Sequence, residues 1–202
     1  MKLKKAFILL NGSEPKTLPE LSEYDIVCAI DGAYNFFEEK NITPDLVTGD
    51  FDSILKIPTS VEVIKTPNQD FTDFEKALQI LKHRGYYHID VYGGSGKEHD
   101  HFLGNISTAK QWKIGLNITF FDDFGKYFFI DEFYNGTNLK DRNISLIPLP
   151  IANGVSTKGL LYPINNETLT FGVRIGTRNK ANENNVQISF DDGDLLLYIS
   201  NR

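Results

Sequence analysis

Aspartates follow short apolar segments in the first half of the chain, at points where strands would end and helices begin. They stand in Asp31-Gly32, in Thr48-Gly49-Asp50-Phe51-Asp52-Ser53, at Asp70, at Asp73 and in Asp100-His101. Carboxylate oxygens are ligands that hard cations such as Mg²⁺ prefer, and such cations are commonly bound together with phosphates. The sequence therefore predicts a site for a hard cation and a polyphosphate.

The segment around Asp50 and Asp52 gives the sharpest signal. In an extended backbone these two side chains point to the same side, and Gly49 allows another part of the backbone to approach closely. Two neighbouring carboxylates repel each other unless a positive charge lies between them, and Mg²⁺ binds one or two carboxylates plus phosphate oxygens. The alternative is an acidic surface turn, but Phe51 between the acids favours a fixed orientation.

The other aspartates have structural alternatives. Asp31 follows a predicted buried strand, where open α/β sheets bind ligands, but it could also cap the following helix. Asp70 and Asp73 are three residues apart at the start of a predicted helix, so we expect them on one face. Capping would explain one of these two carboxylates, and the second suggests a further metal contact.

A glycine-rich turn, Gly93-Gly94-Ser95-Gly96-Lys97, connects a predicted strand to the helix that carries Asp100 and His101. Three glycines and a hydroxyl before a helix N-terminus could bind phosphate through backbone amides. The turn matches neither the Walker A pattern nor the GxGxxG pattern, so its signal is weak by itself. His101 could be an active residue or a buried, hydrogen-bonded one.

Up to about residue 122, apolar runs alternate with segments of helical period, which predicts an α/β domain with a mostly parallel sheet. The predicted strands are Ala6 to Leu10, Ile26 to Ile30, Val61 to Ile64, Ile89 to Tyr92 and Ile118 to Phe121. The predicted helices are Thr72 to Arg84, with a Thr72/Glu75 capping box and Gly85 as its stop, and about Asp100 to Lys113.

After Phe124 the helical period disappears, and short apolar segments are separated by Asn, Gly and Pro. We expect an all-β, sandwich-like domain in which Asp191-Asp192-Gly193 turns the chain into the last strand. The predicted domains are therefore 1–123, an α/β domain, and 124–202, a β-sandwich.

Composition narrows the class of protein. The chain has 202 residues and a formal net charge of −6, so no basic surface is expected for nucleic acid. No apolar run approaches the length of a membrane span. The single cysteine, Cys28, lies in an apolar run and can form no internal disulfide, which fits a reducing, cytoplasmic location.

The motifs in this order resemble the thiamine pyrophosphokinase family. The matching residues are Asp31-Gly32-Ala33, Pro44-Asp45 with Gly49-Asp50-Phe51-Asp52-Ser53, Asp70 to Glu75 with Ala77-Leu78, Gly93 to Gly96 with Asp100-His101 and Asn105, Gly159 to Pro163, and Gly176 to Asn179. The resemblance implies diphosphate transfer from ATP to the hydroxyethyl oxygen of thiamine, with release of AMP. It also implies that domain 1–123 binds ATP and Mg²⁺ and carries catalysis, and that domain 124–202 binds thiamine. The family forms homodimers whose thiamine pockets lie between the subunits, and the resemblance implies the same here.

The resemblance assigns roles to many of the matching residues. It implies that Asp50, Asp52 and Asp73 hold Mg²⁺ and act in catalysis, with one of them or Asp100 accepting the hydroxyl proton. The acceptor would contact Tyr162, Thr177 and Asn179. The residues expected to bind the nucleotide are Asp31, Gly32, Ser53, Asp70, Thr72, Gly93, Gly94, Ser95, Gly96, Lys97, His101 and Asn105.

Three positions depart from the family pattern. Gln69 stands where Lys is common, Glu98 where Arg is frequent, and Arg178 where Ser is frequent. The first two remove positive charge near the expected phosphates, which leaves Lys97, the turn amides and Mg²⁺ to offset it. Two alternatives remain open: a diphosphokinase for another hydroxymethyl heterocycle such as a pterin, and a non-catalytic nucleotide sensor.

Overall fold

The computed structural model describes residues 4–202, so the first three residues of the expected 1–123 domain lie outside it. The chain forms two compact units that divide between Asp123 and Phe124. Each unit is described separately below. None of the helices within residues 4–202 is long and apolar enough to cross a membrane.

The N-terminal unit is built on a parallel sheet of strand order β4-β3-β2-β1-β5-β6. Five of its strands lie where the apolar runs predict them, and β3 is an addition. The apolar run of β3 is too short to be distinguished from the acidic segment that follows it. The strands are β1 Lys5–Leu9, β2 Ile26–Ile30, β3 Leu46–Gly49, β4 Glu62–Lys65, β5 His88–Tyr92 and β6 Asn117–Phe121.

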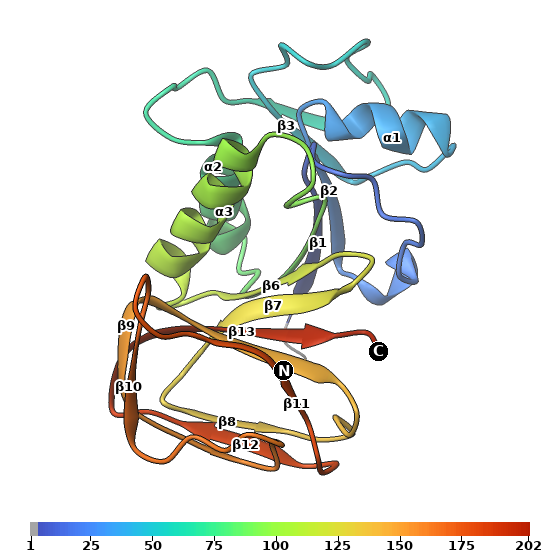
Figure 1. The fold of residues 1–202 in the computed structure, drawn as a ribbon. Helices are drawn as coiled ribbons and strands as arrows, with labels where there is room; N and C mark the ends of the chain where they lie inside the picture. The colour runs from blue at the N-terminus through green and yellow to red at the C-terminus, as the bar shows by residue number, and fades with distance from the viewer. Residues whose placement is uncertain (1–3) are drawn as a thin grey trace. The chain divides into compact units, whose positions relative to one another are not determined.

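Helices cover both faces of this sheet (Figure 1), with α1 on one face and α2 and α3 on the other. Both faces of β1 are therefore buried, and its residues Ala6 to Leu9 are at most 2% exposed. The helices are α1 Ala33–Glu39, α2 Asp73–His83 and α3 His99–Trp112, and a short 3₁₀ helix spans Leu21–Glu23.

The start of α2 follows the sequence prediction in part. Thr72 is the N-cap, and its Oγ1 accepts a hydrogen bond from the Glu75 N–H at 3.2 Å. The Glu75 carboxylate, however, does not complete a capping box. It accepts hydrogen bonds from Gln111 Nε2 at 3.1 Å and Trp112 Nε1 at 3.3 Å, and so connects α2 to the end of α3.

The strand order creates a ligand crevice at one edge of the sheet. From β1 the chain adds β2, β3 and β4 on one side and then returns to place β5 on the other side of β1. Connections leaving β1 and β5 therefore diverge at their carboxyl ends, which is where open α/β sheets bind ligands. The aspartate segments and the glycine turn follow these strand ends.

The C-terminal unit consists of antiparallel strands, and β9 is its central element. The strand β9 continues nine residues beyond the C-terminal end of the predicted segment Ser145 to Leu149. It pairs with β10, β11, β12 and β13. In Figure 1, β8 and β12 form a layer opposite β7 and β13. The strands are β7 Gly125–Ile130, β8 Phe133–Gly136, β9 Asn143–Lys158, β10 Glu167–Thr170, β11 Gly176–Lys180, β12 Val186–Ser189 and β13 Asp192–Ser200.

The expected turn at Asp191-Asp192-Gly193 is wrong. Ser189 pairs with Ser156 of β9, and Asp192 pairs with Asn153, so β12 and β13 follow the same partner strand in the same direction. The Asp191 N–H also donates to the Asn153 carbonyl at 2.8 Å. Polar residues that interrupt an apolar pattern therefore mark the passage from one sheet to the other, because β9 contributes to both.

Candidate active site at the carboxyl edge of the parallel sheet

A cavity of about 630 Å³ lies within the N-terminal unit at the carboxyl ends of the strands. This is within the range of small-molecule and cofactor sites. Most residues expected to bind the nucleotide or metal line it, whereas Gly32 lines a smaller neighbouring pocket. The predicted residues that line the main cavity are Asp31, Asp50, Asp52, Ser53, Asp70, Thr72, Asp73, Gly93, Gly94, Ser95, Lys97, Asp100, His101 and Asn105.

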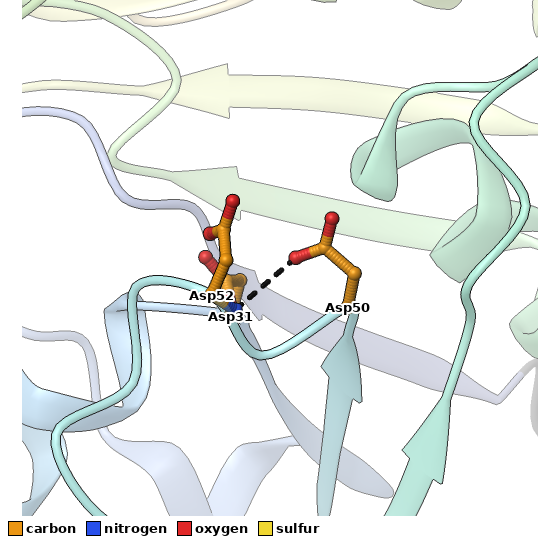
Figure 2. A group of neighbouring side chains, drawn as sticks. All are labelled: Asp31, Asp50 and Asp52. Atoms are coloured by element: carbon orange, nitrogen blue, oxygen red, sulfur yellow. Dashed lines mark hydrogen bonds between the residues drawn. The ribbon is translucent and has the colours of Figure 1, made fainter.

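Three of these carboxylates form a tight group. Asp31 follows β2, and Asp50 and Asp52 follow β3, so the pairing of β2 with β3 brings them together. One oxygen of each lies within 4.8 Å of the others, and Figure 2 shows the three side chains extending from neighbouring loops. Close approach is possible because Gly49 has no side chain: a Cβ there would lie 2.9 Å from the Asp31 Cβ.

Asp31 does not cap the following helix through its side chain. Gly32 is the N-cap of α1, and no side-chain hydrogen bond caps that helix. The Asp31 residue is 8% exposed, and its Oδ1 is buried without a hydrogen-bond partner. A buried carboxylate oxygen without a partner is costly, and a bound cation would satisfy it. The three-carboxylate group therefore fits a hard cation.

Asp50 and Asp52 are close for a different reason from the one predicted. β3 ends at Gly49, and Phe51 has a φ of +71°, so the segment is a turn rather than an extended strand. The Asp52 N–H donates to Asp50 Oδ1 at 3.3 Å, the bond drawn in Figure 2. Phe51 packs against the hydrophobic core, which anchors the turn as its position between two acids had indicated.

Polar neighbours donate hydrogen bonds to both carboxylates. Gln69 Nε2 donates to Asp50 Oδ2 at 3.1 Å, and Ser53 Oγ donates to Asp52 Oδ1 at 2.8 Å. The hydrogen bond from Gln69, and then that from the Asp52 N–H, holds the pKa of Asp50 below its ordinary value. A charged carboxylate is the form that a cation requires.

Asp73 lines the same cavity but lies outside the three-carboxylate group. Its Oδ1 lies 2.7 Å from the Lys76 ammonium, one turn along α2. Burial raises the pKa of Asp73; Lys76 opposes this shift, and the negative charges of Asp50 and Asp31 add to it. Asp70 precedes the Thr72 N-cap, so the expectation that Asp70 and Asp73 share a helix face is wrong.

Lys76 is a buried ammonium that the sequence motif did not single out. It is 6% exposed, and its Nζ donates to the carbonyls of Thr66 at 2.7 Å and Asn68 at 2.9 Å. It therefore connects α2 to the loop that carries Gln69 and Asp70. A lysine three residues after an aspartate in a helix usually lies on a solvated face, so the local sequence does not reveal that Lys76 is buried.

The glycine turn is held by hydrogen bonds to its carbonyl groups. Gly12 and Ser13 donate their N–H groups to the carbonyls of Gly93 at 2.9 Å and Ser95 at 2.7 Å. Asn105 Nδ2 donates to the Gly94 carbonyl at 3.0 Å, so this residue positions the turn from α3. None of these three bonds uses an amide of the turn, which leaves those groups suited to an anion.

The residues at the start of α3 are solvent-exposed. His101 has a 75% exposed side chain and lies 3.7 Å from Glu98, so the buried, structural alternative for this histidine is wrong. Asp100 is also exposed, and its Oδ1 accepts from the His101 N–H at 2.9 Å. Lys97 Nζ donates to Asn11 Oδ1 at 3.0 Å, which places a cation beside the glycine turn.

Asn11 and Asn35 are further polar residues that sequence reasoning missed. Asn11 follows β1 and lines the cavity. Asn35 Nδ2 donates to the Ser53 carbonyl, and its Oδ1 accepts from the Leu55 N–H, both at 3.1 Å. Asn35 thus connects α1 to the loop that follows Asp52. The only available signal was its position four residues after Asp31.

Acidic groups outnumber basic ones around the cavity. Seven carboxylate side chains and two lysines line it. Such a cavity repels a polyphosphate unless cations accompany it. The charge balance therefore agrees with a metal-dependent site for an anionic ligand.

The residues expected to contact the acceptor lie in the C-terminal unit and differ in exposure. Tyr162 and Thr177 are exposed, whereas Asn179 is buried at 8% exposure. The Asn179 side chain bonds to the backbone of Tyr162 in both directions. The polar atoms of the Asn179 side chain are therefore already hydrogen-bonded within the protein.

Two family models together match most of the chain. The model described as "Thiamin pyrophosphokinase, catalytic domain" matches residues 18–120, which include all the cavity residues that follow β2, β3 and β5. The model described as "Thiamin pyrophosphokinase, vitamin B1 binding domain" matches residues 134–195. The chain belongs to the thiamine pyrophosphokinase family.

Individual members of the family agree with this result. A thiamin pyrophosphokinase of Caenorhabditis elegans is 30% identical over 78% of this chain and 72% of its own length. A thiamine pyrophosphokinase of Bacillus subtilis is 27% identical over 96% of this chain and 97% of its own length. The crystal structure of a thiamine pyrophosphokinase from Bacillus subtilis superimposes with a TM-score of 0.84 at 25% identity, covering 98% and 99% of the two chains.

The structure also places the three departures from the family pattern. Gln69 keeps a hydrogen bond to Asp50 without adding charge, and Glu98 lies beside His101 at the exposed start of α3. Arg178 is exposed and has a φ of +54°, and its N–H donates to Ser145 Oγ at 3.0 Å. The fold therefore accommodates each departure without a buried unpaired charge at these positions.

Proposed function

We propose that this protein transfers the terminal diphosphate of ATP to the hydroxyethyl oxygen of thiamine and releases AMP. The observation that carries the proposal is the group formed by Asp31, Asp50 and Asp52, with its buried, unpartnered oxygen, in a chain that matches both family models. The family descriptions favour thiamine over a pterin acceptor, and they favour an enzyme over a nucleotide sensor.

Asp31, Asp50 and Asp52 would hold Mg²⁺. The metal role that the resemblance implies for Asp73 stays a prediction, and it excludes the role of proton acceptor that we propose for Asp73 below. Bound Mg²⁺ offsets negative charge on the phosphates in the ground state and the transition state. The protein contributes position: the core-packed Phe51 and the hydrogen bonds from Gln69 and Ser53 fix the carboxylates. Fixed groups need no reorganisation when charge develops, which lowers the barrier.

The nucleotide would lie along the glycine turn. The groups suited to its phosphates are the amides of Gly93, Gly94 and Ser95 and the Lys97 ammonium, whereas Gly96 belongs to the turn but does not line the cavity. Asp70, Thr72, His101 and Asn105 line the same cavity. Gln69 and Glu98 bring no positive charge, so we assign more of the charge neutralisation to Mg²⁺ and Lys97 than in relatives with Lys and Arg at those positions.

The acceptor oxygen would attack the β-phosphorus in line with the departing AMP, and its proton must pass to a base. Asp73 and Asp100 are the candidates among the carboxylates outside the metal group. Burial raises the pKa of Asp73, which makes it a stronger base than an exposed carboxylate. We therefore assign proton acceptance to Asp73 and positioning of the acceptor to Tyr162 and Thr177.

The metal assignment is tested by turnover and by Asp52→Asn. With ATP, Mg²⁺ and thiamine, the native protein should release AMP and form thiamine diphosphate, and chelation by EDTA should stop the reaction until Mg²⁺ is restored. Asp52→Asn removes one metal-holding charge and should lower the rate by at least ~100-fold, because each 1.36 kcal/mol of lost stabilisation is a factor of ten.

The matched control is Asp131→Asn, which changes an exposed carboxylate of the C-terminal unit and should retain native turnover. The unfolding temperature of each variant should lie within a few degrees of that of the native protein. Near-native AMP release by a folded Asp52→Asn protein would contradict the metal role of Asp52. Absence of AMP with the native protein would contradict the proposed reaction itself.

Arg178 tests the identity of the acceptor. Thiamine carries a permanent positive charge, and a guanidinium ~4 Å from it would repel it by roughly 1 to 4 kcal/mol. Because Arg178 is exposed, we expect its side chain to lie away from the acceptor, so Arg178→Ser should leave the KM for thiamine within about threefold, a change below about 1 kcal/mol.

The assay compares AMP release by the native and Arg178→Ser proteins with thiamine and with a neutral hydroxymethyl pterin. We expect both proteins to use thiamine and neither to prefer the pterin. If the native protein used only the pterin and Arg178→Ser gained thiamine turnover, the thiamine assignment would be wrong.

We further propose a homodimer formed through the C-terminal unit, with active sites at the subunit interface, in the cytoplasm. The connection between β10 and β11 exposes three apolar side chains: Phe171 at 57%, Val173 at 85% and Ile175 at 41%. This connection lies opposite the Pro148 to Pro150 part of β9. The prolines have no N–H to donate to a neighbouring strand, so β10 and β11 do not form one continuous strand there. Exposed apolar clusters of this kind favour a protein partner.

The dimer prediction is tested by Val173→Asp. A charge in an interface of ~1,200 Å² or more should shift the protein toward monomer at micromolar concentration, as measured by light scattering. Ile114→Asp is the control, because Ile114 is also 85% exposed but lies in the N-terminal unit, and it should remain dimeric. A native protein that is monomeric and active at assay concentration would refute the homodimer.

A further inference from the structure

The segment Gly159 to Pro163 is held against the end of β11 by backbone hydrogen bonds. The Leu161 N–H donates to the Lys180 carbonyl at 2.8 Å, and the Asn182 N–H donates to the Gly159 carbonyl at 2.8 Å. Leu160 and Ala181 form an antiparallel bridge between them. This backbone pairing stops before Tyr162, and the next residue, Pro163, has no N–H to continue it.

The Asn179 side chain provides the hydrogen bonds to the next residue, Tyr162. Its Oδ1 accepts from the Tyr162 N–H at 3.1 Å, and its Nδ2 donates to the Tyr162 carbonyl at 2.6 Å. The same Oδ1 accepts from the Lys180 N–H at 2.8 Å. The amide thus bonds both polar groups of one residue, as a neighbouring strand would do, and three of its four hydrogen-bonding positions are used.

The backbone before Asn179 directs this side chain inward. The pairing of β11 with β9 shifts register between Gly176 and Asn179, and Arg178 has a φ of +54°. Such an irregularity re-aims the side chains that follow it. Arg178 is left exposed, and Asn179 is 8% exposed.

Tyr162 depends on this support because little packing fixes it. The residue is 68% exposed, so few side-chain contacts hold it, and the backbone that carries it sets the point from which the ring extends. An exposed aromatic face in a fixed position suits a planar cation, which the ring quadrupole attracts. Loss of the backbone bonds would let the ring sample other directions and weaken that contact.

We infer that Asn179 is a positioning residue that acts on the acceptor through the backbone of Tyr162, and is not itself an acceptor contact. This inference rests on the proposed function, in which Tyr162 contacts thiamine. It revises the role that the family resemblance suggested for Asn179. It also predicts that the two residues act as one unit, so their effects on acceptor use are not additive.

The test is a double-mutant cycle with Asn179→Asp and Tyr162→Ala. Asn179→Asp keeps the size of the side chain but replaces the donor to the Tyr162 carbonyl with a carboxylate oxygen. It should lower kcat/KM for thiamine by about 10-fold, the scale of one lost hydrogen bond, and leave the KM for ATP within about twofold. In the Tyr162→Ala background the same change should lower kcat/KM by less than about twofold.

Asn184→Asp is the control for added negative charge, since Asn184 is exposed in the same unit, and it should behave as the native protein. An equal loss caused by Asn179→Asp in both backgrounds would overturn the inference, because it would show an independent contact with the acceptor. So would a fall in thiamine use accompanied by an equal rise in the KM for ATP.

A second measurement needs no variant. In the native protein without ligands, the Tyr162 amide should exchange its hydrogen with solvent at least ~10-fold more slowly than an unprotected amide, because Asn179 Oδ1 accepts from it. Free exchange at this amide would overturn the inference even if Asn179→Asp failed to fold. Protection at Tyr162 together with no AMP release from thiamine would instead refute the proposed function.

Discussion

Electrostatic repulsion among three carboxylates is the constraint on which the N-terminal unit depends. Two unit charges at the 4.8 Å limit that separates the oxygens of Asp31, Asp50 and Asp52 repel by about 3 kcal/mol at an effective dielectric constant of about 20. Positive φ values at Asp31 and Phe51 add strain of about 1 to 3 kcal/mol each. These costs concentrate at the site, as expected where geometry serves function. The parallel sheet, buried on both faces of β1, offsets them and holds the group in place.

The same logic explains why polar side chains surround the site as supports. Asn35, Asn105 and Lys76 each bond to backbone carbonyls of a loop that carries site residues. Asn179 does the same for Tyr162 in the C-terminal unit. Loops at strand ends have few neighbours of their own, and side-chain amides supply the missing partners. Asn105 and Asn179, which the family resemblance suggests as ligand contacts, thus both bond to the backbone of segments that carry other site residues.

Local interactions explain what could be predicted from the sequence. The Thr72 cap depends on a residue three positions away, and the buried face of α2, formed by Phe74, Ala77, Leu78 and Leu81, repeats every three or four residues. The buried strands stand out as apolar runs. The three-carboxylate group does not follow from local spacing. Asp31 joins Asp50 and Asp52 only because β2 pairs with β3. The family resemblance had instead suggested Asp73 as the third metal ligand. The length of β9 was also hidden, because its prolines and glycine interrupt an apolar pattern that the curved strand continues through.

The central claim is that Asp31, Asp50 and Asp52 hold the catalytic cation. The most direct measurement is anomalous diffraction from crystals of the native protein grown with Mn²⁺ and a non-hydrolysable ATP analogue. We predict an anomalous peak within coordination distance of carboxylate oxygens from all three residues, beside the phosphates of the analogue. A peak bound by Asp73 or Asp100 without Asp31, or phosphates bound with no metal at this group, would contradict the account.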